Sequence, residues 1–142
     1  MNYLDQLDQM FDAKYRLIAM ETYDPKRVEE LITQLSRLSN KAYYISRPGR
    51  GMARVGASHI EIPRTRETME ILNHIYDARH FGVYILCDFH HALEESAVVN
   101  RLLEIIKSDS PKVVMLLGAN IELPPRLKPY TMRSKHQIKS TA

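Results

Sequence analysis

The chain has little of several features that would assign it to a particular class of protein. Its 142 residues include a single cysteine, Cys87, which excludes an internal disulfide and is typical of a reducing compartment. No apolar run approaches the roughly 18 residues that a membrane span needs. The opening residues, MNYLDQLDQMFDAK, carry acids and lack the basic and apolar regions of a secretory signal. We therefore expect one soluble, cytoplasmic domain over residues 1–142, with no membrane partner.

Strand and helix patterns alternate along most of the chain. Apolar residues at helical spacing predict helices over residues 2–14, 25–40, 65–79 and 98–106. Apolar runs predict strands over residues 15–23, 41–47, 82–89 and 112–119. These strands are apolar on both faces and need cover on both sides. The pattern predicts a three-layer α/β domain, with a mostly parallel sheet of four or five strands and helices on both faces.

Two segments show no such periodicity. Residues 49–63 contain three glycines and give no clear pattern, so we expect a loop. Residues 122–130, ELPPRLKPY, contain three prolines, which prevent a regular element. The last residues, 129–142, are expected to form a flexible or extended tail.

Polar side chains follow each of the four predicted strands. In an open parallel sheet the ligand site lies at the carboxyl ends of the strands. The polar residues at these ends are Glu21, Thr22, Asp24, Arg47, Asp88 and Asn120. We expect them to form a cluster at one edge of the sheet.

Four segments, in this order and spacing, carry a family resemblance: RLIAMETYDPKRVEEL, YYISRPGRG, YILCDFHHAL and VMLLGANIELPPRL. Together they resemble the amino-terminal, P-loop-lacking domain of bacterial, cyanobacterial and chloroplast AAA ATPases, a degenerate module that precedes the true ATPase module. The resemblance implies a degenerate AAA or P-loop NTPase-like core. It also implies that Asp88 occupies the position of the aspartate that holds magnesium in an active AAA ATPase. The sequence has no catalytic module of its own, which leaves open whether it works alone or with a separate ATPase.

The turn after the first predicted strand lacks the residues that bind a triphosphate. A phosphate-binding loop needs glycines, whose amides turn toward the phosphates, and a lysine that reaches the β and γ oxygens. The segment ETYDPKRVEEL has no glycine, and it places Glu21 and Asp24 where the phosphates would lie. Phe89 follows Asp88 where an AAA ATPase needs a carboxylate to activate water. We therefore expect no ATP hydrolysis, no enzymatic activity and no bound cofactor.

A metal site is a second interpretation of the stretch around Asp88. Carboxylate and imidazole are ligands for zinc, manganese or iron, so Asp88, His90 and His91 could hold such an ion. On an extended strand Asp88 and His90 would point the same way, and Glu21, His59 or a partner would have to complete the site. Cys87, in contrast, stands in an apolar run and is expected in the core rather than as a nucleophile.

Basic residues are concentrated in two segments. Residues 41–66 contain six basic residues and one acid, and residues 110–142 again contain six and one. Such segments attract phosphate, nucleic acid or an acidic protein surface. In the first segment, the candidates for binding an anion or a partner are Arg47, Arg50, Arg54, Arg64 and Arg66.

The function that these patterns favour is that of a non-catalytic interaction or regulatory module. Such a module would associate with copies of itself, with a separate ATPase or with another protein. The alternative is binding of nucleic acid or another polyanion through the arginine-rich loop and the basic tail. A small metal-dependent hydrolase is the third function.

Overall fold

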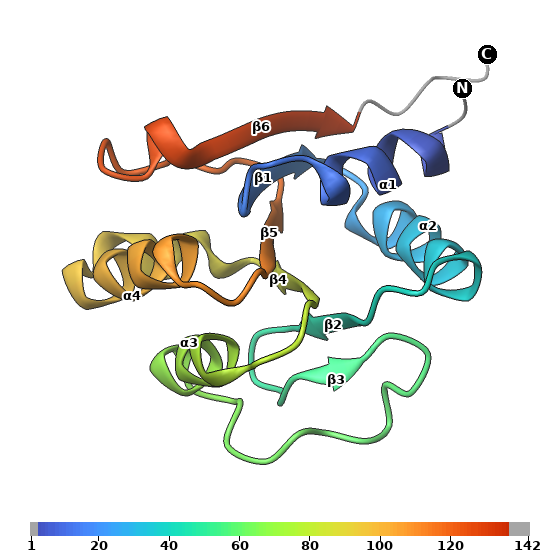
Figure 1. The fold of residues 1–142 in the computed structure, drawn as a ribbon, viewed down its shortest axis with the longest axis horizontal. Helices are drawn as coiled ribbons and strands as arrows, with labels where there is room; N and C mark the ends of the chain where they lie inside the picture. The colour runs from blue at the N-terminus through green and yellow to red at the C-terminus, as the bar shows by residue number, and fades with distance from the viewer. Residues whose placement is uncertain (1–2, 137–142) are drawn as a thin grey trace.

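A six-stranded sheet lies between two layers of helices in the computed structural model, which describes residues 3–136 (Figure 1). The elements, of which η1 and η2 are 3-10 helices, are α1 (Tyr3–Asp12), β1 (Leu17–Thr22), α2 (Pro25–Leu38), β2 (Tyr43–Ser46), β3 (Ala53–Arg54), α3 (Thr68–Asp77), β4 (Val83–Cys87), η1 (Phe89–Glu94), α4 (Ser96–Lys107), β5 (Val113–Gly118), η2 (Lys128–Tyr130) and β6 (Thr131–His136). The predicted α/β fold is confirmed. None of the described helices has the length and apolar character to cross a membrane.

The strands follow one another across the sheet in the order β3-β2-β4-β5-β1-β6. All neighbouring pairs are parallel except β2 and β3, which are antiparallel. β1 lies between β5 and β6, so that Leu17 is opposite Val114 on one side and Thr131 on the other. The parallel strands therefore all end at one edge of the sheet, and this edge positions the candidate site.

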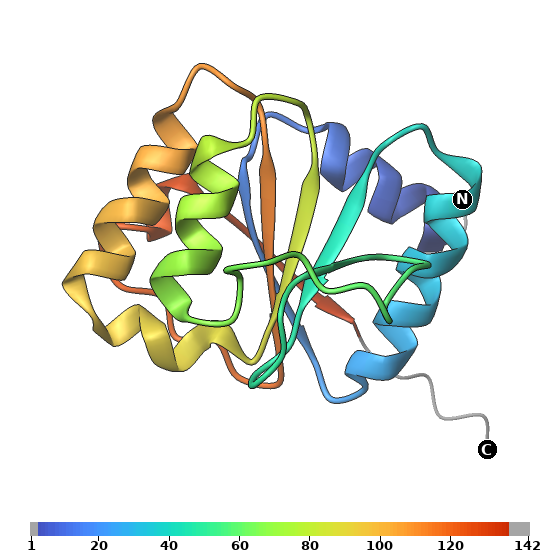
Figure 2. The same cartoon turned by 90° about the horizontal axis from the view of Figure 1, so that it is seen from below.

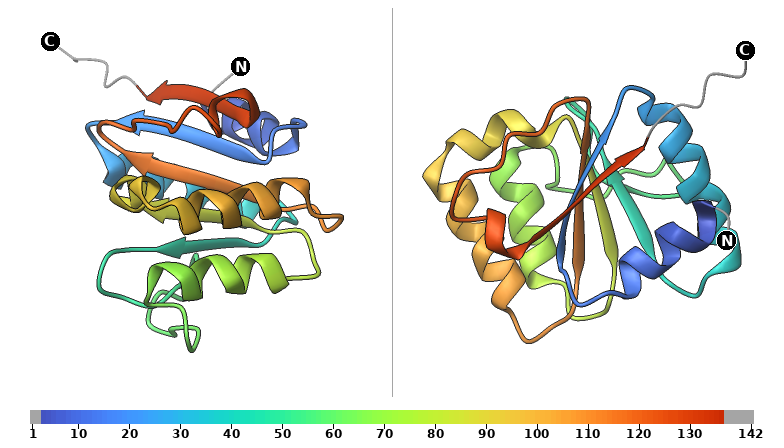
Figure 3. Two further views of the ribbon diagram at one scale, coloured as in Figure 1. Left: turned by 90° about the vertical axis from the view of Figure 1, so that its left-hand side faces the viewer. Right: turned by 90° about the horizontal axis from the view of Figure 1, so that it is seen from above.

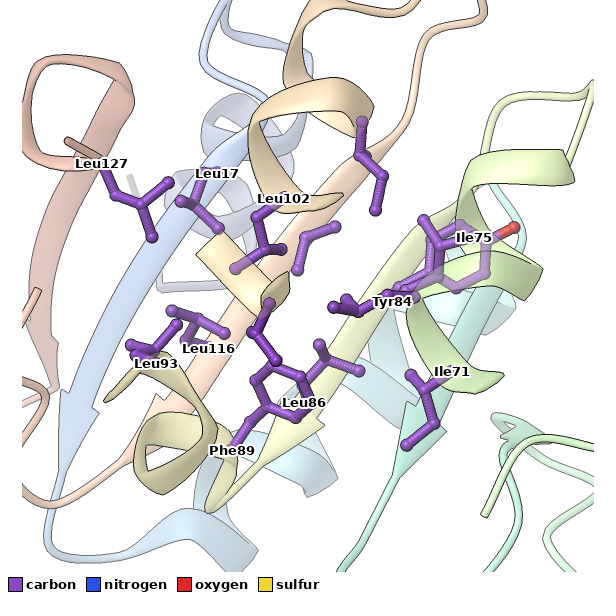
Figure 4. Packing of buried hydrophobic residues seen from close by; sticks show 14 of the residues in the cluster. Leu17, Ile71, Ile75, Tyr84, Leu86, Phe89, Leu93, Leu102, Leu116 and Leu127 are labelled. Atoms are coloured by element: carbon purple, nitrogen blue, oxygen red, sulfur yellow. The ribbon is translucent and has the colours of Figure 1, made fainter. Parts of the chain in front are cut away.

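Each face of the sheet has its own hydrophobic core. Alternate residues of a strand point to opposite faces, so Leu17 and Ala19 of β1 pack against α3 and α4, whereas Ile18 and Met20 pack against α1 and α2. Figure 2 shows the two helix pairs on opposite sides of the strands. In Figure 4, Leu86 and Leu116 of the sheet meet Leu102 of α4. Because successive residues of each central strand enter the two cores in turn, these strands are apolar along their whole length.

The structure corrects the expected number of strands and the expected tail. It has six strands rather than four or five, because Ala53–Arg54 and Thr131–His136 both pair with the sheet. The segment predicted as a flexible or extended tail, 129–142, begins with the end of η2 and all of β6, and residues 137–142 lie outside the described part. Tertiary pairing with β1 stabilises β6, whose own sequence, TMRSKH, lacks a strong strand signal.

The amino-end edge of the sheet holds cations for a structural reason. Lys112, which is 1% exposed, donates a hydrogen bond from Nζ to the carbonyl oxygen of Tyr76 at 2.6 Å, near the end of α3. Arg16 donates to the carbonyl oxygens of Ile106 and Ser108, at the end of α4. Cations at helix carboxyl ends satisfy free carbonyls and interact favourably with the helix dipole. Part of the basic character of residues 110–142 is therefore committed to the fold.

Candidate functional site

The turn from β1 to α2 occupies the position where a P-loop protein would bind phosphate. Thr22, 2% exposed, accepts a hydrogen bond at Oγ1 from the amide of Asp24 at 3.0 Å. Asp24 in turn caps α2, because its Oδ1 accepts from the amide of Arg27 at 3.2 Å, with Pro25 in the first turn. A helix amino end binds anions readily. Here the protein's own carboxylate satisfies it, which disfavours an incoming phosphate.

Glu21 is held by a residue that the sequence patterns did not identify. Its Oε1 accepts a hydrogen bond from Arg133 of β6 at 2.8 Å, and Arg133 also donates to the carbonyl oxygen of Ile121 at 3.1 Å. The hydrogen bond from Arg133 lowers the pKa of Glu21 below its usual value. Within residues 3–136 neither Arg47 nor Asn120, both members of the predicted strand-end cluster, forms a salt bridge or hydrogen bond with Glu21. Arg133 was missed because its segment was assigned to the tail.

Arg47 and Cys87 both face Glu29 of α2. Arg47 forms a salt bridge with Oε1 of Glu29, and Sγ of Cys87 lies 3.7 Å from the same oxygen. Burial, together with the charge of Glu29, raises the pKa of the Cys87 thiol to about 12. A thiol with so high a pKa is a poor nucleophile at neutral pH.

Asp88 ends β4 in a left-handed conformation, with φ 53° and ψ 33°. Its amide donates to the carbonyl oxygen of Leu117 at 2.9 Å, but its exposed carboxylate forms no hydrogen bond or salt bridge with any residue in the range 3–136. An exposed carboxylate is solvated by water and does not need a protein partner.

The two histidines that follow Asp88 do not lie on an extended strand. η1 begins at Phe89, so the predicted strand alternation of Asp88 and His90 is wrong. The rings of His90 and His91 have centroids 4.3 Å apart. Asp88 and His90 meet over Gly118 at the end of β5, where an added Cβ would lie 3.3 Å from Nδ1 of His90 and 3.7 Å from Oδ1 of Asp88.

These residues do not form the metal centre considered above. Among the residues that the structure describes, no group of three or more His, Cys, Asp or Glu side chains could hold a metal ion. Glu21 is engaged by Arg133, and His59 is an exposed residue of the loop after β3. The chemistry of a metal-dependent hydrolase therefore has no support from this arrangement.

Two hollows flank Asp88 and η1 at the carboxyl ends of the strands. The first, about 340 Å³, has charged and imidazole side chains in its lining: Arg47, Arg66, Asp88, His91 and Glu95. The second, about 490 Å³, has polar side chains in its lining: His90, His91, Glu94, Asn120 and Glu122. Neither hollow is lined by the β1–α2 turn. The predicted polar residues therefore share one edge of the sheet, but neither of these two hollows brings all of them together.

Most arginines of the predicted anion-binding loop are paired with acids. Arg50 and Arg66 lie 3.8 Å and 2.8 Å from the carboxylate of Glu61, and Arg47 pairs with Glu29. Arg54 and Arg64 are exposed and make no salt bridge within the described part of the chain. The loop is thus less basic toward solvent than its composition indicates.

Comparison of the sequence with known proteins and protein families shows which family the chain belongs to. No curated protein matches the sequence significantly. A family model described as the N-terminal domain of SpoVK-like AAA ATPases matches residues 3–136, from the first described helix to the last strand. The chain belongs to this family of SpoVK-like AAA ATPase N-terminal domains.

Proposed function

We propose that this chain is a non-catalytic module that packs against an AAA ATPase, or against another copy of itself, through the carboxyl-end surface. We define this surface as the two hollows and the exposed residues Asp88, His91 and Asn120 between and beside them. The observation that carries the proposal is the β1–α2 turn, where Asp24 caps the helix that would otherwise bind phosphate. In a chain that belongs to an AAA ATPase domain family, a carboxylate of the protein itself takes the place at this helix end that a phosphate would need.

Family membership supports an ATPase as the partner. The matching family is described as a domain of AAA ATPases, so an ATPase module is the natural neighbour of this domain. The carboxyl-end surface carries both signs of charge, with the acids Asp88 and Glu95 and the base Arg66, which is paired with Glu61. Asp88 is exposed and has no partner among the described residues. Such mixed polar surfaces confer specificity on a protein interface more than raw affinity.

Nucleotide binding is the first test of the proposal. Isothermal titration of the chain with ATP and Mg²⁺ should give no measurable binding, because Asp24 occupies the helix amino end and the turn has no glycine. Hydrolysis is a separate question from binding, and it is not expected either, because Phe89, 9% exposed, stands where a carboxylate would be needed to activate water. Micromolar affinity for ATP that Asp88→Ala abolishes would overturn the proposal, because the site would then be a working nucleotide site.

Association is the second part of the same test. Sedimentation velocity of the chain, alone over a range of concentrations and with the ATPase module of a SpoVK-like protein, should show a complex or a self-associated species. Asp88→Asn removes the exposed charge and should weaken the association. Asp109→Asn makes the same change at an exposed residue that follows α4, away from the hollows, and should not. A chain that stays monomeric in every mixture, or equal effects of the two variants, would exclude this surface.

A further inference from the structure

The two edges of the sheet are built differently. β3 has two residues, and an isolated bridge from Ala53 to Glu61 brings the following loop against it. β6 has six residues and pairs with β1 over its whole length, from Thr131 to His136. No described strand lies on its other side, and Figure 3 shows β6 in front of the sheet when the molecule is seen from above. One edge is therefore short and blunted, whereas the other is long and open.

An open edge presents a row of unpaired amide and carbonyl groups that can template another strand. In β6 two basic residues two positions apart, Arg133 and Lys135, lie opposite Ala19 and Glu21 of β1, and so point to one face. Arg133 is engaged by Glu21, while Lys135 is exposed and interacts with Glu21 through its charge without forming a salt bridge with a described residue. The face of this edge that points toward α3 and α4 is therefore basic.

The charge pattern selects among the strands that could pair with β6. Two copies of β6 pairing antiparallel about a twofold axis would bring Arg133 and Lys135 of both copies to the same face, and like charges across strands are destabilising. A strand with acids at alternate positions would instead place a carboxylate beside Lys135. We propose that the open edge of β6 binds an extended acidic segment of a partner protein as a seventh strand.

The two faces of β6 define the sequence that such a segment needs. On the opposite face Met132 is half-buried against the core that α1 and α2 cover, and Ser134 follows it at the next position on that face. Main-chain hydrogen bonds supply affinity in strand addition, and alternate side chains supply specificity. The segment therefore alternates acids, facing Lys135, with apolar residues, facing Met132.

A labelled peptide of about seven residues with alternating valine and glutamate, slightly longer than a mean strand, is the probe for this edge. Fluorescence anisotropy should show saturable binding to the whole chain, and hydrogen exchange at the amides of β6 should slow in the complex. Lys135→Glu should weaken binding at least tenfold and create binding of the matching valine and lysine peptide. Arg79→Glu, a charge change of the same size at an exposed residue after α3, should alter neither affinity.

Backbone pairing is separated from simple charge attraction by a second peptide. The same acidic sequence with an N-methyl group at every residue keeps its charge but has no amide donor toward either edge, so it should not bind. Equal binding of the methylated peptide, unchanged exchange in β6, or no binding of either peptide would each overturn the proposal. A dimer that Lys135→Glu strengthens or abolishes, in the absence of peptide, would show that β6 pairs with a second copy instead. The edge of β6 is separate from the carboxyl-end surface, so these outcomes do not depend on the proposed function.

Discussion

At the scale of single residues, Asp88 has a role that requires neither metal nor partner. It is one of two non-glycine residues with positive φ in the described range, the other being Arg64. Among residues with a side chain, aspartate and asparagine tolerate the left-handed region best. An acid at this position is therefore explained in part by the backbone, which must leave β4 and enter η1 within one residue.

Substitutions at Asp88 should follow backbone preference rather than charge. We expect Asp88→Asn and Asp88→Gly to change the free energy of unfolding by less than about 0.5 kcal/mol, whereas Asp88→Ala should cost about 1 to 2 kcal/mol, the left-handed penalty of an ordinary residue. Urea denaturation of the three variants measures the difference. Alanine and asparagine variants of equal stability would contradict this account of the turn.

At the scale of elements, the sequence could predict those whose signals are local. The cap at Asp24 with Pro25 marks the start of α2, and the apolar run of residues 112–119 contains β5. β6 could not be predicted, because its alternating polar residues form a strand only through pairing with β1. Sequence patterns missed the salt-bridge partner of Glu21 for the same reason. The strand-end position of Glu21 is a local signal, but Arg133 reaches it only through the tertiary fold.

The attachment of β6 to β1 should depend on pH through Glu21. Arg133 lowers the pKa of Glu21, so the ionised carboxylate stabilises the folded state above its unfolded pKa, near 4.5, and that contribution is lost as the pH falls through the lowered folded value. Arg133→Ala should lower the free energy of unfolding by about 0.5 to 1 kcal/mol at pH 7, as for a partly exposed pair. The deficit should shrink as the solution is acidified below pH 4.5.

Urea denaturation at a series of pH values measures this deficit, with Arg54→Ala as the control because Arg54 is exposed and lacks a salt bridge in the described chain. A deficit for Arg133→Ala that stays constant into acid would mean that Arg133 acts through its hydrogen bond to Ile121 and not through Glu21.

At the scale of the whole molecule, the arginine loop offers a polyanion less positive charge than its number of basic residues indicates. Because Arg47, Arg50 and Arg66 are paired with acids, we expect single-stranded DNA to bind no tighter than about 10⁻⁶ M at physiological salt, the range of non-specific binding. Arg54→Ala should reduce the salt dependence of any binding more than Arg50→Ala does. Anisotropy titrations over a range of salt measure both. Nanomolar affinity at physiological salt would make nucleic-acid binding the leading function.

The place of β1 between β5 and β6 has a consequence for the nascent chain. Among the described strands β1 is synthesised first, and its residues from Leu17 to Met20 are fully buried in the finished sheet, on both faces. Its two neighbours are the last of the described strands to leave the ribosome, and the bond from Arg133 to Glu21 spans 112 residues. Until Val113–Gly118 emerges, this apolar strand has no sheet partner, whereas β2 and β4 can already pair. Completion of the sheet is therefore a late event with a large loop-closure cost, and β1 is the segment whose exposure during synthesis a chaperone would have to shield.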